Sequence, residues 1–315
     1  MDPQVEALLQ MMAAQARASG APAFTELPAA QARAMMDAGF AAFNAGAPAI
    51  GSIADRIVPG PAGGIPVKVF TPVGDGPFPL LVYLHGGGWV IGSPETHLRL
   101  CSELALGANA VVVSVHYRLA PEHPAPAALD DCVAAILWSV AHASELSADG
   151  TRFAIGGDSA GGNLTAAACL RLRDEGGPQA KLQLLLYGAY SNNLNTESAI
   201  ANGEGKILTR EAMVWFWGHY LSGGVDPADP SISPLNGDLH GLPPARLIVG
   251  TLDPLLDESK LFAKALEDAD VPTTLSIYQD MPHVFLQLSG ILDGGRKGVE
   301  EAAAALRQAF DGAGA

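Results

Sequence analysis

Hydrophobic and polar residues change their spacing repeatedly along this chain. Residues 65–71 alternate between the two kinds, which is typical of a half-buried strand, and Pro72 ends the pattern. Uninterrupted hydrophobic runs follow at 80–84 and 110–115, and such runs are typical of strands buried on both faces of a parallel sheet. Further strands are expected at 152–155, 182–187, 246–249 and 273–278.

Segments with the spacing of amphipathic helices lie between these strands. They cover residues 93–106, 125–143, 160–173, 258–269 and 295–310. This alternation predicts an α/β fold with a mainly parallel, doubly wound sheet. In such a sheet, active residues gather on loops at the carboxyl ends of the strands.

Two segments do not fit the alternation, residues 1–50 and about 191–222. Both carry helical patterns, including a Trp- and Phe-rich helix at 211–221, and neither has a strand partner. We therefore expect one catalytic domain over residues 51–315. The two helical segments are expected to form a cap over it, residues 1–50 being its N-terminal part.

The composition indicates a folded protein with an acidic surface. Hydrophobic residues make up 49% of the chain, and the net charge is −15, which disfavours nucleic acid and anionic membranes as partners. No hydrophobic run is long enough for a transmembrane helix, and the first residues lack the pattern of a signal peptide. Three cysteines without paired spacing predict free thiols, no metal site and a cytoplasmic location.

Candidate chemistry begins with the G-x-S-x-G sequence at residues 157–161. A glycine-rich helix start would also read this way, but the pentapeptide follows a strand and opens an apolar helix, as a nucleophile elbow requires. Side chains two positions before and after the serine would collide in such a turn. The helix N-terminus also favours developing negative charge, so Ser159 is the predicted nucleophile.

The sequence HGGG at 85–88 directly follows the first uninterrupted hydrophobic run. Consecutive glycines let backbone N–H groups converge on one oxygen without side-chain obstruction. We predict Gly87, Gly88 and Ala160 as the N–H donors of an oxyanion hole, the alternative being a flexible surface turn. His85 is expected to hold the loop through hydrogen bonds rather than to react.

A serine hydroxyl is a poor nucleophile until a base takes its proton. His283 follows the strand at 273–278 and so belongs to the catalytic edge, whereas His240 precedes a strand and belongs to the opposite edge. Asp253 follows the preceding strand and is predicted to orient the imidazole. Asp257 fits better as the N-cap of the next helix. The resulting order of Ser, Asp and His is that of known hydrolase triads.

Together these motifs resemble the hormone-sensitive-lipase-like family of bacterial carboxylesterases, in its GDSAG branch of the α/β-hydrolase superfamily. The matching segments are 85–93, 117–131, 156–163, 233–259 and 280–285. The resemblance implies an α/β-hydrolase fold and hydrolysis of short-chain carboxylic esters without a cofactor. It implies the same triad, Ser159, Asp253 and His283. Family members often form homodimers through their last strand, here near 273–278.

The hydrophobic side chains near the predicted site allow two interpretations. Trp89, Met213, Trp215, Phe216 and Phe285 are candidates for a substrate pocket, although the same residues could instead pack inside the cap. Arg118 is expected to form an ion pair beneath the active-site loop, and Asp158 to be held in structural hydrogen bonds.

The predicted function is a serine carboxylesterase for small-molecule esters with short to medium chains. An amidase or peptidase with the same triad is an alternative, which a substrate panel would separate. A non-catalytic member of the fold that binds a small ligand is another. Covalent labelling of Ser159 by a fluorophosphonate would distinguish it from an enzyme.

Overall fold

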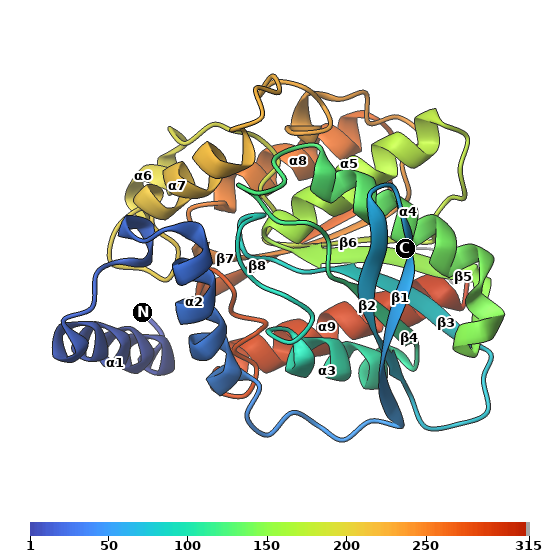
Figure 1. Cartoon of the computed structure of the whole chain (residues 1–315), viewed down its shortest axis with the longest axis horizontal. Coiled ribbons are helices and arrows are strands. Elements are labelled where there is room, and N and C mark those ends of the chain that lie inside the picture. Colours follow the sequence, from blue (N-terminus) through green and yellow to red (C-terminus); the bar gives the residue numbers. More distant parts are fainter. Residues whose placement is uncertain (313–315) are drawn as a thin grey trace.

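The strands in residues 1–312, the part of the chain that this computed structural model describes, form one mixed sheet (Figure 1). Their order is β1-β2-β4-β3-β5-β6-β7-β8; β1, β2 and β4 pair antiparallel, and all pairs from β4 through β3 to β8 are parallel. The strands are β1 (Ser52–Gly60), β2 (Gly63–Thr71), β3 (Phe78–Leu84), β4 (Val111–Val115), β5 (Ala148–Asp158), β6 (Gln183–Leu186), β7 (Ala245–Leu252) and β8 (Thr273–Pro282).

The central strands are hydrophobic throughout because both of their faces are covered. In β3, Leu80, Val82 and Leu84 belong to one core cluster, whereas Leu81 and Tyr83 belong to another on the opposite face. Successive side chains of a strand point to opposite faces, so an uninterrupted apolar run supplies both cores at once.

Helices cover the two faces of the sheet as separate layers (Figure 1). Helices α3 and α9 lie on one face, and α4, α5 and α8 lie on the other. The α-helices of the described residues are α1 (Pro3–Ser19), α2 (Ala29–Phe43), α3 (Leu98–Ala108), α4 (Ala127–Ala141), α5 (Ala160–Asp174), α6 (Glu197–Ala201), α7 (Arg210–Tyr220), α8 (Leu256–Asp268) and α9 (Asp293–Phe310). Three 3₁₀ turns accompany them at η1 (Phe24–Glu26), η2 (Ala143–Leu146) and η3 (Pro234–Asn236).

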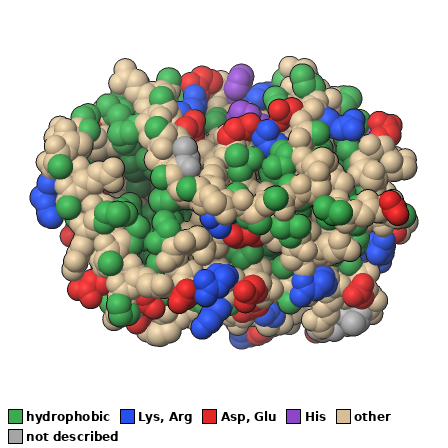
Figure 2. Space-filling view, turned by 90° about the horizontal axis from the view of Figure 1, so that it is seen from below, with side chains coloured by type: hydrophobic (Ala, Val, Ile, Leu, Met, Phe, Trp, Pro, Cys, Tyr) green, Lys and Arg blue, Asp and Glu red, His purple; other side chains and the backbone are tan. Residues whose placement is uncertain are grey.

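Helices α1, α2, α6 and α7 lie together at one end of the molecule, outside the two layers (Figure 1). A small hydrophobic cluster joins α2 and η1 to α7 and to the loop after β3. Its buried members are Ala29, Val90, Ile91, Ala120, Ala212 and Phe216. At the same end, Figure 2 shows a hollow lined with hydrophobic side chains.

Most of the sequence-based elements are present in the structure, but strand β1 and helix α6 were not expected. The strand β1 was missed, because seven of its nine residues are exposed and give no buried pattern. Helix α3 begins at Leu98, five residues later than expected. Within residues 1–312, no helix combines the length and the hydrophobicity needed to cross a bilayer.

Candidate active site

Ser159 lies in a sharp turn between the end of β5 and the start of α5. Its backbone has φ 54° and ψ −118°, a conformation that costs a non-glycine residue energy and is found mainly at functional sites. A β-carbon placed on Gly157 would lie 2.5 Å from the Leu84 carbonyl oxygen, and one on Gly161 would overlap that same oxygen. Both glycines of the pentapeptide are therefore required, as the sequence suggested.

The side chains of Ser159, His283 and Asp253 form one hydrogen-bonded chain. His283 Nε2 lies 2.9 Å from Ser159 Oγ, and His283 Nδ1 lies 2.7 Å from Asp253 Oδ2. Asp253 is fully buried, His283 is 4% exposed and Ser159 is partly exposed. The Asp253 carboxylate accepts a hydrogen bond from His283 Nδ1–H. In the neutral imidazole the proton is then on Nδ1, so Nε2 is unprotonated and can accept the proton of Ser159.

The other two members of this hydrogen-bonded chain, Asp253 and His283, lie at the carboxyl ends of β7 and β8. Asp253 follows β7 directly, and its Oδ1 accepts a hydrogen bond of 2.8 Å from the Leu255 backbone N–H. His283 follows β8, whose pairing with β7 shifts register between Gly250 and Leu252. Tyr187 packs edge-on against the His283 ring at 5.0 Å between centroids. The imidazole is thus held by packing as well as by hydrogen bonding.

The glycine loop after β3 takes a backbone path open to few residue types. Gly87, Gly88 and Trp89 all have positive φ angles, of 116°, 59° and 61°. The Gly87 carbonyl accepts hydrogen bonds from the N–H groups of Val90 (3.1 Å) and Ile91 (2.9 Å). These two hydrogen bonds close a tight turn after Gly87.

Asp158, beside the nucleophile, ties the elbow to the glycine loop. Its Oδ1 accepts hydrogen bonds from the Gly86 N–H (2.9 Å) and the Tyr83 hydroxyl (2.8 Å), and it lies 3.1 Å from His97 Nε2. Burial raises the pKa of Asp158, but His97 and the Tyr83 hydrogen bond outweigh it and lower the pKa overall. Asp158 therefore occupies the Gly86 amide, which is not one of the predicted oxyanion donors.

His85 is fully buried and holds the loop from behind. Its Nδ1 donates to the Gly86 carbonyl at 2.7 Å, and its ring stacks on Tyr117 at 4.2 Å. Burial, together with the neighbouring His97, lowers the pKa of His85 to about 3, so the ring is neutral at ordinary pH. Tyr117 in turn donates to the His85 carbonyl at 2.6 Å. These contacts fit the expected supporting role.

The five side chains considered for a substrate pocket separate into two groups. Trp89 and Phe285 are 2% and 0% exposed, because Trp89 stacks on Tyr220 and Phe285 packs against Tyr187. These two are therefore the most deeply packed of the five candidates. Met213, Trp215 and Phe216 lie on α7, where Met213 is buried and Trp215 is partly exposed.

Phe216 has the closest relation to the predicted site. A β-carbon placed on Gly88 would overlap the Phe216 ring, so the ring lies directly on the glycine loop. Phe24 of the N-terminal segment contacts the same ring at 5.7 Å between centroids. Both helical segments thus meet beside the predicted oxyanion donors.

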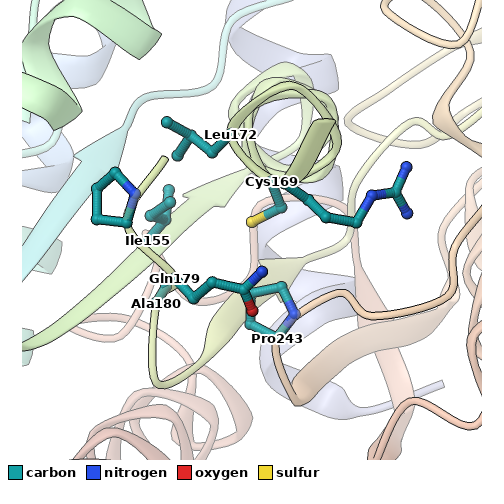
Figure 3. Close-up of a pocket in the computed structure, with 8 residues that line it drawn as sticks. Ile155, Cys169, Leu172, Gln179, Ala180 and Pro243 are labelled. Atoms are coloured by element: carbon teal, nitrogen blue, oxygen red, sulfur yellow. The ribbon is translucent and has the colours of Figure 1, made fainter. Parts of the chain in front are cut away.

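Two cavities elsewhere contain none of the predicted catalytic residues. The one in Figure 3 lies between Cys169, Leu172 and Pro243 and holds about 10 Å³, barely room for one water molecule. The other, about 740 Å³, lies behind the glycine loop and is lined by residues that include Arg33, His116 and Ser93. No group of His, Cys, Asp and Glu side chains in residues 1–312 is arranged to hold a metal ion.

A comparison with protein-family models matches residues 81–287 to the model described as the alpha/beta hydrolase fold. The match spans more than half of the chain and includes all three residues of the hydrogen-bonded chain. This protein belongs to that family.

Several curated proteins and solved structures that this alpha/beta hydrolase resembles are named as esterases or ester hydrolases. It is 45% identical to the carboxylic ester hydrolase LipN of Mycobacterium tuberculosis, over 81% of this chain and 70% of LipN. The ester-hydrolase EH1AB1 from the Lake Arreo metagenome is 38% identical with a TM-score of 0.95, over 99% of both chains. A hyperthermophilic esterase of the archaeon Pyrobaculum calidifontis is 36% identical with a TM-score of 0.93, over 98% of both chains.

Several structural expectations for this alpha/beta hydrolase can now be compared with the contacts. Arg118 forms an ion pair with buried Asp131 at 2.8 Å, although Arg118 itself is partly exposed. His240 is a surface residue paired with Asp238. The expectation that Asp257 caps α8 was wrong, because α8 already begins at Leu256.

Sequence reasoning missed Arg33 and His97, which contact the glycine loop and the elbow, respectively. Neither belongs to a short motif with the residues it contacts. Arg33 lies in a segment expected to be helical, and His97 lies inside the helix that the sequence predicts over 93–106. Only the three-dimensional structure brings them to the site.

Proposed function

We propose that this alpha/beta hydrolase is a serine carboxylesterase that acts through an acyl-enzyme. The observation that supports this best is the His283 ring, whose two nitrogens contact Ser159 Oγ and Asp253 Oδ2 at 2.9 and 2.7 Å. The esterase names of its relatives point to the same chemistry. We assign Ser159 as nucleophile, His283 as general base and Asp253 as the group that orients it.

In the first half-reaction, Ser159 Oγ attacks the ester carbonyl carbon while His283 Nε2 takes the hydroxyl proton. The carbonyl π electrons move to its oxygen, where we assign the N–H groups of Gly87, Gly88 and Ala160 as donors. As the tetrahedral intermediate collapses, the ester C–O bond breaks. His283 gives its proton to the departing oxygen, and the alcohol leaves.

In the second half-reaction, water takes the place of the alcohol. His283 accepts a proton from that water, whose oxygen attacks the acyl carbon and forms a second tetrahedral intermediate. Collapse of this intermediate breaks the bond to Ser159 Oγ, which takes the proton back from His283. The products are the carboxylic acid and the free enzyme, and no step requires a cofactor.

We further propose that residues 1–50 and 191–222 form a cap that limits the substrate to short and medium chains. The support is the Phe216 ring on Gly88 and the apolar cluster that joins α7 to α2. Met213 and Trp215, on the same helix, are candidates for the remaining wall. The hollow at this end of the molecule, lined with hydrophobic side chains, suits an apolar acyl or alcohol group (Figure 2).

The proposal also includes an oligomeric state and a cellular location. Strand β8 is the edge of the sheet and exposes Ile277 to 44%, which favours a homodimer through this edge, measurable by light scattering. All three cysteines are free and buried, which favours a reducing compartment such as the cytoplasm.

The catalytic assignment is tested with Ser159→Ala. We expect the variant to lose turnover of p-nitrophenyl acetate and labelling by a fluorophosphonate, because no other group in the site can form the acyl bond. The wild type should be labelled at Ser159, which peptide mass spectrometry locates. Wild-type rates in the variant, or labelling at another residue, would contradict the assignment.

A further inference from the structure

The glycine loop does not hold its shape through its own sequence. Trp89 is a bulky residue with a φ of 61°, a region that costs a non-glycine residue about 1 kcal/mol or more. The two glycines before it could adopt many other conformations. Contacts from outside the loop must therefore select the conformation in which the amides of Gly87 and Gly88 face the substrate.

Part of that support comes from α7. The Trp89 ring stacks on Tyr220 at 4.2 Å and an interplanar angle of 5°, and it contacts Trp217 at 4.4 Å. This fixes the side chain of Trp89. It does not fix the peptide groups that connect Trp89 to the following residues.

Those peptide groups are held by Arg33 of α2. Its Nε donates to the Val90 carbonyl at 2.6 Å, and its Nη2 donates to the Ala120 carbonyl at 2.6 Å. The Val90 N–H is the group that donates to the Gly87 carbonyl, and the Ala120 N–H donates to the Trp89 carbonyl at 2.9 Å. One guanidinium thus reaches two residues, each of which is bonded in turn to the glycine loop.

Glu122 keeps the guanidinium in that orientation. Its two carboxylate oxygens pair with the two terminal nitrogens of Arg33, at 2.9 Å for Nη1. The Arg33 side chain is 22% exposed and that of Glu122 is 50% exposed, so the pair lies at the rim of the molecule. A planar, forked donor suits this task, because it can meet a carboxylate and two carbonyls in one plane.

We propose that Arg33 is a positioning residue for the oxyanion hole, through which the N-terminal helical segment sets the catalytic rate. This rests on the proposed function, since it concerns the geometry of the same oxyanion donors. Helix α2 is joined to the glycine loop by this side chain and by the apolar cluster of Val90 and Ile91. Loss of the guanidinium lets the loop relax and moves the donors away from the developing oxyanion.

The test compares Arg33→Ala with the wild type on p-nitrophenyl butyrate. We expect kcat to fall about 10-fold or more while KM changes less than about 3-fold, because donor misalignment acts in the transition state. The affinity for a trifluoromethyl ketone, which forms a tetrahedral adduct, should fall in parallel. Rates are counted per active site titrated with fluorophosphonate, so misfolded protein does not contribute.

Milder variants test the same idea if Arg33→Ala folds poorly. Arg33→Lys keeps the charge but has no planar fork, and Glu122→Gln keeps an acceptor without its charge. Both should lower kcat less than Arg33→Ala does. The matched control is Arg210→Ala, which removes an arginine side chain of α7 that donates to the Leu194 carbonyl and to Asn195 Oδ1 rather than to the glycine loop.

Two outcomes would overturn the proposal. In one, Arg33→Ala melts at a lower temperature but keeps kcat and ketone affinity within about 2-fold of the wild type, as a merely stabilising residue would. In the other, Arg210→Ala loses as much activity as Arg33→Ala. A wild type that neither labels at Ser159 nor hydrolyses esters would instead contradict the esterase assignment itself.

Discussion

A methyl group on Gly161 would overlap the Leu84 carbonyl oxygen and lie 2.8 Å from that of His85. Both are backbone atoms at the end of β3, which the sheet holds on both sides. Neither can move without shifting the strand that carries the glycine loop. Close backbone approach, rather than freedom of φ, is therefore what requires glycine at this position.

This predicts that Gly161→Ala loses both activity and stability. We expect turnover to vanish and the free energy of unfolding to fall by about 3 kcal/mol, the upper range for overpacking a core. Gly218→Ala is the control, since a β-carbon at Gly218 meets nothing within 4 Å and the residue lies inside α7. It should be stabilised by about 0.5–1 kcal/mol in urea unfolding, with activity unchanged. Equal stability of the two variants would refute this account.

Single residues differ in how far the sequence predicts them. Ser159 and Gly87 belong to short motifs whose spacing follows from local backbone geometry, so they were identified directly. Asp253 and His283 needed the additional inference that each follows a strand of one parallel sheet. Arg33 could not be found this way, because its role comes from contacts more than 50 residues away in the chain.

Among the elements, the path from β6 into the second helical segment depends on one buried carboxyl group. Glu258, in the first turn of α8, is 2% exposed, and its Oε2 accepts hydrogen bonds from the N–H groups of Tyr190 (2.7 Å) and Ser191 (2.9 Å). Burial raises the pKa of Glu258 to about 8, despite these two donors. The carboxyl group is thus mostly protonated in the folded state at neutral pH.

A raised carboxyl pKa has a defined effect on stability. The folded state keeps a proton on Glu258 that the unfolded state releases near pH 4.5, so this stabilisation is lost as pH rises toward 8. Relative to Glu258→Gln, the wild type should lose up to about 1.4 kcal/mol per pH unit across that window. Urea unfolding at pH 5, 6.5 and 8 measures it. If the free energies of unfolding of the two proteins changed with pH in the same way, Glu258 would have an ordinary pKa.

Buried strands were easier to predict from the sequence than exposed ones. Strands β3 and β4 have uninterrupted apolar runs because helices cover both of their faces. Strand β1 is an exposed antiparallel edge that includes Pro59, so tertiary pairing with β2 forms it where the sequence gives no pattern. Likewise, the five residues of α6 are too few for a helical period to be recognised.

At the scale of the whole molecule, the proposed cap places its two helical segments beside the glycine loop. Phe216 lies on Gly88, with Phe24 behind it. An acyl chain that extends past the oxyanion donors on this side must displace the Phe216 ring. Under the proposed function, contacts between segments that lie nearly 200 residues apart limit the length of the acyl chain.

We expect the wild type to prefer p-nitrophenyl acetate and butyrate over longer esters. In Phe216→Ala, the ratio of kcat/KM for the octanoate to that for the acetate should rise about 10-fold, since a pocket typically discriminates by that factor or more per methylene. Val214→Ala, on the same helix but 50% exposed, is the control and should leave the ratio unchanged. A profile that already rises toward long chains in the wild type would contradict the limit.

The position of β8 has a consequence for how activity arises during synthesis. This strand is the last in chain order and pairs only with β7, and it carries His283, 124 residues beyond Ser159. The proposed nucleophile is therefore synthesised before the proposed base. We expect a chain that ends before residue 283 to lack esterase activity, because no imidazole is then present to take the serine proton.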